Sequence, residues 1–170
     1  MLYRYIIIVL CALLANQAQA QDDLQIGSLL AKEEVSIDTK KTWTNESSKS
    51  QWSSKYGGKN VTLIHLRGNS LPDYDLKVFK SLTMIPSDSI SYEIERKIIE
   101  DIKEATKHEV SYRDSRLYYG LFQLPHKAGY KKRYIFYRNN ALHQNTDGML
   151  TLIYMEGSAS IHQLRKMFKK

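Results

Sequence analysis

Short runs in which apolar and polar side chains alternate recur along the second half of the chain. Such alternation is typical of β-strands that turn one face toward a core. Clusters of Gly, Pro, Asn and Asp, which favour turns, separate the runs. We therefore predict five strands, at residues 61–67, 75–84, 116–124, 133–138 and 149–156. The first two are expected to form a hairpin, because strands that follow one another along the chain are usually neighbours.

A helical spacing replaces this alternation between residues 87 and 107. Isoleucines recur there every four residues, which aligns them on one stripe of an amphipathic helix, at positions 90, 94, 98 and 102. Ser87, Asp88 or Ser89 can cap the start of this helix. Charged residues occupy its other positions, so we expect the helix to lie on a face of the sheet. Shorter helices are predicted at residues 22–31 and after Ser160.

These elements predict an α+β fold in one domain, residues 21–170. We expect an antiparallel sheet of about five strands, one long amphipathic helix packed on a face, and short terminal helices at the edges. Residues 38–60 are rich in Ser, Thr, Lys, Asn and Gly and have no apolar period, which predicts a mobile loop. Its rings, Trp43, Trp52 and Tyr56, either anchor the loop or form a stacking platform, and we favour the anchor.

The first twenty residues have the pattern of a secretory signal peptide. Arg4 gives a positive start, residues 5–14 are continuously apolar, and Ala18-Gln19-Ala20 has the small-x-small pattern of a cleavage site. An apolar run this short is below the ~20 residues that a membrane-spanning helix needs. We predict cleavage near Ala20 and export to the periplasm or the cell surface.

The cysteine content and the net charge of residues 21–170 limit how the protein can be stabilised and which partners it favours. The only cysteine is Cys11, so residues 21–170 have none, and their stability is expected to come from a packed core. The whole chain has 25 Lys and Arg against 18 Asp and Glu; without Arg4 the balance is 24 against 18, or +6. This charge suits an anionic partner or simply keeps an exported protein in solution.

No motif in the chain specifies a reaction. The five histidines are not spaced to bind zinc, and the chain has no phosphate-binding glycine loop and no nucleophile elbow. We therefore expect no metal and no cofactor. A carboxylate pair for hydrolysis would have to come from distant positions such as Glu109, Asp114 and Glu156, which is a weak signal.

The segment that most resembles a binding site is the basic and aromatic run KAGYKKRYIFYR, residues 127–138. In a strand, Tyr134 and Arg138 would share one face, while Arg133 would lie on the other. Such residues can bind an anionic or sugar-like ligand, although lysines at a hairpin end also protect sheets from edge pairing. The candidate contact residues are Lys131, Lys132, Arg133, Tyr134 and Arg138.

In the segments KVFKSLTM, EVSYRDSRLYYGLFQLP, RYIFYRN and LTLIYMEGSAS, the chain resembles a small exported family of unknown function from Bacteroidales bacteria. The resemblance extends from Leu76 to the C-terminus and includes no catalytic signature. It implies a signal peptide, a periplasmic or surface location and one compact α+β domain, and it implies no active-site residues.

These observations favour a non-enzymatic binding or interaction module of the cell envelope. Its partner would be an anionic glycan or an envelope protein; nucleic acid fits the charge but does not fit export. Two alternatives remain open: a hydrolase that acts on envelope glycans, and a structural subunit of an envelope complex. A pair of facing carboxylates would favour the hydrolase, and a large exposed apolar patch would favour the subunit.

Overall fold

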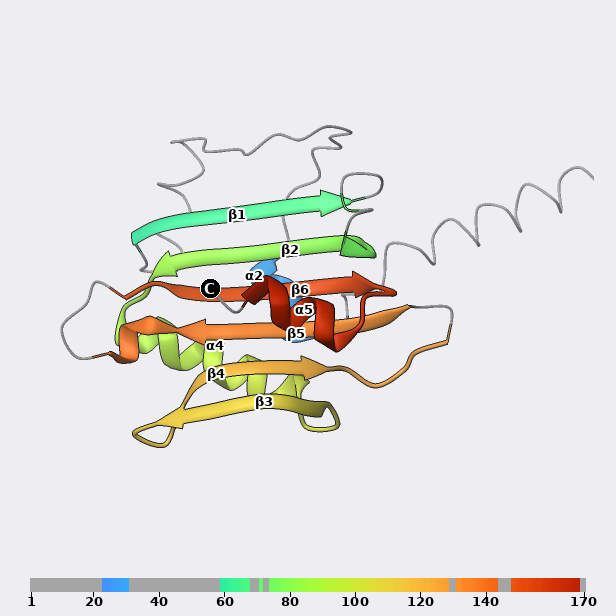
Figure 1. Cartoon of the computed structure of the whole chain (residues 1–170). Helices are drawn as coiled ribbons and strands as arrows, with labels where there is room; N and C mark the ends of the chain where they lie inside the picture. The colour runs from blue at the N-terminus through green and yellow to red at the C-terminus, as the bar shows by residue number, and fades with distance from the viewer. Residues whose placement is uncertain are drawn as a thin grey trace, which may run out of the picture.

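The computed structural model describes residues 23–30, 59–67, 71, 74–128, 131–143 and 148–168. Their central feature is one antiparallel sheet of six strands, in the order β1-β2-β6-β5-β4-β3 (Figure 1). The strands are β1 Lys59–Arg67, β2 Leu76–Ile85, β3 Thr106–Arg113, β4 Arg116–Gln123, β5 Lys132–Asn139 and β6 Leu150–Gly157.

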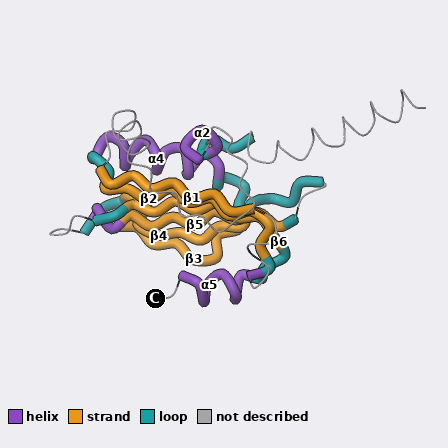
Figure 2. Tube along the Cα trace, turned by 90° about the horizontal axis from the view of Figure 1, so that it is seen from above, coloured by secondary structure: helices purple, strands orange, loops and turns teal. Residues whose placement is uncertain are grey.

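Helices lie on both faces of this sheet (Figure 2). Helices α2, Gly27–Leu30, and α4, Asp88–Asp101, cover one face, and α5, Ile161–Phe168, lies on the other. A short 3₁₀ turn, η3, Asn140–Leu142, follows β5. The molecule therefore has two different sheet surfaces, which we call the α4 face and the α5 face.

The α+β class and the β1–β2 hairpin are confirmed, the latter with Thr62 opposite Thr83. Two other predictions were wrong. The sheet has six strands rather than about five, because Thr106–Arg113 forms the edge strand β3. This strand is mainly polar, so it lacks the alternation of a half-buried strand. The predicted helix of residues 87–107 is also shorter, 14 residues, because the backbone leaves the helix at Ile102.

The start of α4 agrees with the sequence, but the place of the C-terminal helix does not. Of the three predicted candidates, Ser87 is the N-cap of α4, and its hydroxyl accepts from the Ile90 amide at 3.5 Å. The C-terminal helix α5 begins after Ser160, but it packs on a sheet face rather than at an edge. Of the predicted loop 38–60, Lys59 and Asn60 belong to β1, and residues 38–58 lie outside the described part of the chain, as do residues 1–20.

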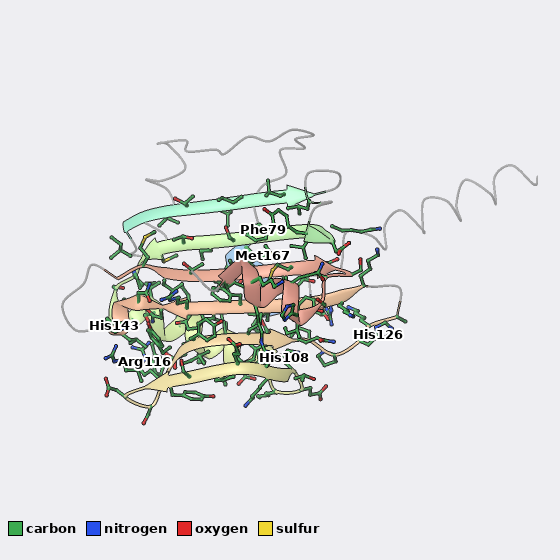
Figure 3. All side chains as sticks on the ribbon, in the orientation of Figure 1. Phe79, His108, Arg116, His126, His143 and Met167 are labelled. Atoms are coloured by element: carbon green, nitrogen blue, oxygen red, sulfur yellow. The ribbon has the colours of Figure 1, made fainter. Side chains whose placement is uncertain are left out.

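Two apolar clusters hold the layers together. On the α4 face, Ile94 and Ile98 of α4 and Ile26, the residue before α2, pack on the sheet and are at most 1% exposed. On the α5 face, Leu164 packs against a cluster that includes Phe136 and Met155. Phe79 and Met167 lie at the margin of that cluster (Figure 3). Among the described helices, none has the length and apolar character needed to cross a membrane.

Candidate functional site

The five predicted contact residues follow one another along β5 but do not form one surface. Successive side chains of a strand point to opposite faces. Arg133 therefore lies on the α4 face, whereas Lys132, Tyr134 and Arg138 lie on the α5 face, as the two core clusters on either side of β5 confirm. Lys131, just before the strand, and Lys132 are exposed.

Arg133 is buried and linked to the N-terminal segment. Its guanidinium donates from Nη1 to the Asp23 carboxylate at 3.4 Å and from Nη2 to the Pro125 carbonyl at 3.3 Å. Lys127 Nζ lies 3.2 Å from the same carboxylate. Burial works to raise the pKa of Asp23, but the two cations outweigh it and hold that pKa below its usual value. These contacts connect the segment before α2 to the sheet.

Tyr134 is buried between the sheet and the segment that leads into α5. It is 1% exposed, and its hydroxyl donates to the Ala159 carbonyl at 2.9 Å. Burial raises the pKa of this phenol. Tyr134 thus fixes the chain just before α5, and an external ligand does not reach it in this arrangement.

Arg138 is half-buried at the other end of β5. Its Nε donates to Asn140 Oδ1 at 3.0 Å, and the Tyr118 hydroxyl donates to the same oxygen at 3.3 Å. The His143 ring meets the Tyr118 ring edge to face, with centroids 5.5 Å apart. Figure 3 places His143 at this end of the sheet and His126 at the opposite end. Arg138 is therefore oriented by a polar group that the loop after β5 supplies.

The backbone around Asn140 is itself fixed. The Asn140 amide donates to the Met149 carbonyl at 3.0 Å, which closes the loop between β5 and β6. A Cβ atom at Gly148 would lie 2.2 Å from the Asn140 carbonyl carbon, so a side chain there would displace Asn140. Glycine at position 148 thus maintains the position of the group that orients Arg138.

The strand register places Arg138 in a row of polar side chains across the α5 face. Arg138 pairs with Thr151 of β6, Thr151 with Thr83 of β2, and Thr83 with Thr62 of β1. We call these four residues the threonine–arginine row. All four are half-buried. The next row on the same face is more deeply buried, since Ser81, Ile153 and Phe136 are at most 6% exposed. Its fourth residue, Ile64, pairs with Ser81 and is half-buried.

Helix α5 reaches that second row at Phe136. Phe168, the last described residue of α5, stacks on Phe136 with ring centroids 4.0 Å apart. Within the described part of the chain, the Arg138 side chain has one hydrogen bond and the three threonine hydroxyls have none. The row is therefore a polar strip that the protein's own described contacts leave largely unsatisfied.

The two accessible basic positions of β5 are far apart. Lys132 and Arg138 are separated by six residues of strand, or roughly 20 Å at ~3.4 Å per residue. Tyr134 and Phe136 lie between them and are covered by the α5 cluster. The predicted contact residues thus form two separate basic positions at opposite ends of the strand, rather than one continuous patch.

The three carboxylates that the sequence offered for hydrolysis are not brought together. Glu109 lies on the α5 face, where Arg165 Nε is 2.8 Å from its Oε1. Glu156 lies on the α4 side and accepts from the Tyr154 hydroxyl at 2.7 Å. Asp114 is in the turn between β3 and β4. No group of three His, Cys, Asp or Glu side chains among the described residues could hold a metal ion.

Sequence reasoning singled out Arg138 but missed the residues around it. Thr62, Thr83 and Thr151 lie on three strands, and only the register between strands places them in one row with Arg138. Asn140 belongs to a loop whose conformation no local pattern indicated. The sequence gives only a weak indication of the row, because each threonine occupies a position that alternates with apolar residues in a predicted strand.

The fold and this row define a single-sheet α+β domain with one closed face and one partly open face. Residues 49–168 match the family of unknown function DUF6108, and the chain belongs to that family. The match extends well before Leu76, where the sequence resemblance began, and it leaves α2 outside. No curated protein and no solved structure matches the chain.

Proposed function

We propose that this protein is an exported, non-enzymatic binding module of the cell envelope that contacts an anionic ligand through the α5 face. The observation that carries the proposal is the threonine–arginine row. Its arginine and three threonines lie side by side and are half-buried, and their side chains make a single hydrogen bond within the described residues. A folded domain pairs the polar groups that it buries, whereas half-buried groups without an internal partner stay in contact with water. Groups left in this state are available to an external ligand.

Charge and sequence support the same function. Residues 21–170 carry a net +6, which favours anionic partners. Residues 1–20 have the pattern of a signal peptide, and this supports export to the periplasm or the surface. The separation of Glu109, Glu156 and Asp114 gives no support to hydrolysis, because that reaction needs two carboxyl groups that face one substrate.

Export is tested separately from binding. The full chain is expressed in its native cell type with a C-terminal tag, the cells are fractionated, and the N-terminus of the purified protein is sequenced. We expect the protein in the envelope or periplasmic fraction and a mature N-terminus close to Gln21. An intact Met1 in the cytosolic fraction would contradict the export part of the proposal.

Binding is tested by thermal shift on residues 21–170 with glycans, peptidoglycan fragments and polyanions at low and high salt. We expect at least one anionic ligand to raise the melting temperature, with a smaller rise at high salt because salt screens exposed charges. The matched variants are Arg138→Met and Lys132→Met, which remove the two accessible basic positions of β5 one at a time. A flat response to the whole panel would overturn the small-ligand proposal.

A further inference from the structure

The geometry of Arg138 restricts which part of its guanidinium a ligand can reach. Nε is occupied, because it donates to Asn140 Oδ1 at 3.0 Å. The two terminal Nη groups have no partner among the described residues, and together they form a planar fork of parallel N–H donors. Such a fork matches the two oxygens of a carboxylate in a bidentate pair. The free edge of Arg138 is therefore suited to one planar oxyanion.

The electrostatic surroundings leave this cation without a carboxylate of its own. An acidic side chain of the same face, Glu109, lies two strands away from β5. Arg165 pairs with Glu109 at 2.8 Å, and the Tyr119 hydroxyl donates to it at 3.1 Å. Glu109 is thus already neutralised. The positive charge of Arg138 remains available to an anion from outside.

The rest of the row indicates what is attached to that anion. Three threonine hydroxyls, each both a donor and an acceptor, extend from Arg138 across neighbouring strands. Strand spacing of ~4.8 Å makes the whole row roughly 14 Å long. A ligand that satisfies it needs one negative charge followed by several neutral hydroxyl groups. A polyphosphate or nucleic acid would need several cations at this length, and the row supplies one.

We infer that the threonine–arginine row is a binding site for an acidic saccharide of the uronic acid class. The sugar carboxylate pairs with the Nη groups of Arg138, and the sugar hydroxyls bond to Thr151, Thr83 and Thr62. Asn140 acts as a positioning residue, since it holds Nε and so aims the fork. This inference rests on the proposed function and names the ligand class of the same face.

Oligomers of galacturonic acid, with their methyl esters as the matched neutral probe, test the ligand class. Isothermal titration calorimetry with residues 21–170 is expected to show binding of the acid form. The ester should bind at least tenfold more weakly, because it offers the same hydroxyls without the charge. Equal affinity for the two forms would overturn the carboxylate assignment.

Matched variants test the position of the site. Arg138→Met is expected to lose binding of the acid form at least tenfold, whereas Lys132→Met, on the same face at the far end of β5, should change it less than twofold. Thr151→Val and Thr83→Val keep the side-chain shape and should weaken binding severalfold each. Binding that survives Arg138→Met would place the site elsewhere and overturn the inference.

The role of Asn140 in positioning the Arg138 guanidinium is tested by a separate measurement. Asn140→Ala frees Nε, so binding should weaken while the Arg138 side chain gains mobility, measured as changed NMR relaxation of its labelled guanidinium Nε. Unchanged relaxation together with unchanged binding would contradict the positioning role. Thermal melting of every variant checks that folding is intact, which we expect because all substituted side chains are at least partly exposed.

Failure of this inference and failure of the proposed function are distinguishable. If galacturonate oligomers do not bind but another anionic ligand raises the melting temperature in a manner sensitive to Arg138→Met, the uronic acid assignment fails and the binding module remains. If no ligand of the panel binds, both fail.

Discussion

A polar cluster on the α4 face and the threonine–arginine row on the α5 face differ in how far their side chains are paired. On the α4 face, Glu95 is 5% exposed and accepts from Arg116 Nε at 2.8 Å and from the Leu117 amide at 2.6 Å. Ser91 accepts from both Arg116 and Asn139. On the α5 face, the threonine–arginine row has a single hydrogen bond among the described residues. The cluster around Glu95 fixes α4 on the sheet, whereas the side chains of the row are left accessible.

The comparison shows where a functional site can be sought in a domain whose sequence has no motif. Buried polar groups with complete partners stabilise the packing of layers and offer nothing to a ligand. Half-exposed polar groups in register across several strands contribute little to stability, because their partner in the folded state is water. We therefore expect substitutions on the α4 face to affect folding and substitutions in the row to affect binding.

The largest effect is expected from removal of α2. A chain that starts at residue 49, where the family match begins, lacks Ile26, Leu29 and Leu30, which are at most 2% exposed. Full burial of each such side chain contributes about 1.5–3 kcal/mol, partly offset by the entropy of ordering the segment. We expect the free energy of unfolding to fall by about 4 kcal/mol, measured by urea denaturation. A shortened chain as stable as residues 21–170 would show that α2 is not part of the cooperative unit.

A smaller loss of stability is expected when one isoleucine of the α4 face is replaced by Ala, and an isoleucine of the α5 face gives the control. Ile98 of α4 is 0% exposed, and its replacement by Ala should cost about 3 kcal/mol, because it leaves a cavity in a closed core. Ile64 of β1 is half-buried on the α5 face, and Ile64→Ala should cost about 1 kcal/mol or less. Equal losses in urea denaturation would mean that the α5 face is as tightly packed as the α4 face.

The next smaller effect on the free energy of unfolding is expected from the buried ion pair of the α4 face, Glu95 with Arg116. Glu95→Gln removes the charge that pairs with Arg116 and weakens the bond to the Leu117 amide. Breaking a buried pair costs several kcal/mol, but the Arg116 side chain is 23% exposed, so we expect about 2 kcal/mol. A double-mutant cycle with Arg116→Met measures the coupling between the two residues. A coupling energy near zero would contradict their role in fixing α4 on the sheet.

Sequence patterns predicted the elements better than the site, and the reason is physical. Runs rich in apolar and aromatic residues identified the two central strands β5 and β6, which bury both faces, and isoleucine spacing identified α4. The edge strand β3 was missed because Lys107, Glu109 and Ser111 leave it without an apolar period. Arg138 was found among its chain neighbours, but its partners Thr151 and Asn140 depend on strand register and loop conformation. These are long-range properties that no local pattern encodes.

The smallest effect is expected at Tyr119, which lies beside Arg138 on the α5 face. Burial, together with the hydrogen bond to Glu109 and its negative charge, raises the pKa of Tyr119 from 10.0 to about 12. The folded state therefore retains this proton where the unfolded state loses it, so the contribution of Tyr119 to stability is complete below pH 10 and declines as the pH rises toward 12. Tyr119→Phe removes this contribution and should cost about 1 kcal/mol or less at neutral pH.

Alkaline unfolding measures that contribution directly. The free energy of unfolding should fall more steeply above pH 10 in the wild type than in Tyr119→Phe. In a titration followed by tyrosinate absorbance, Tyr119→Phe should show one fewer tyrosine that ionises above pH 10. The α4 face gives the matched control, since burial also raises the pKa of Tyr137 and Tyr154, and Tyr154→Phe should likewise flatten the alkaline slope. If Tyr119→Phe leaves the slope unchanged while Tyr154→Phe reduces it, Tyr119 is open to water. The half-covered part of the α5 face would then extend from the row into β4, and the site for a ligand would be wider than four residues.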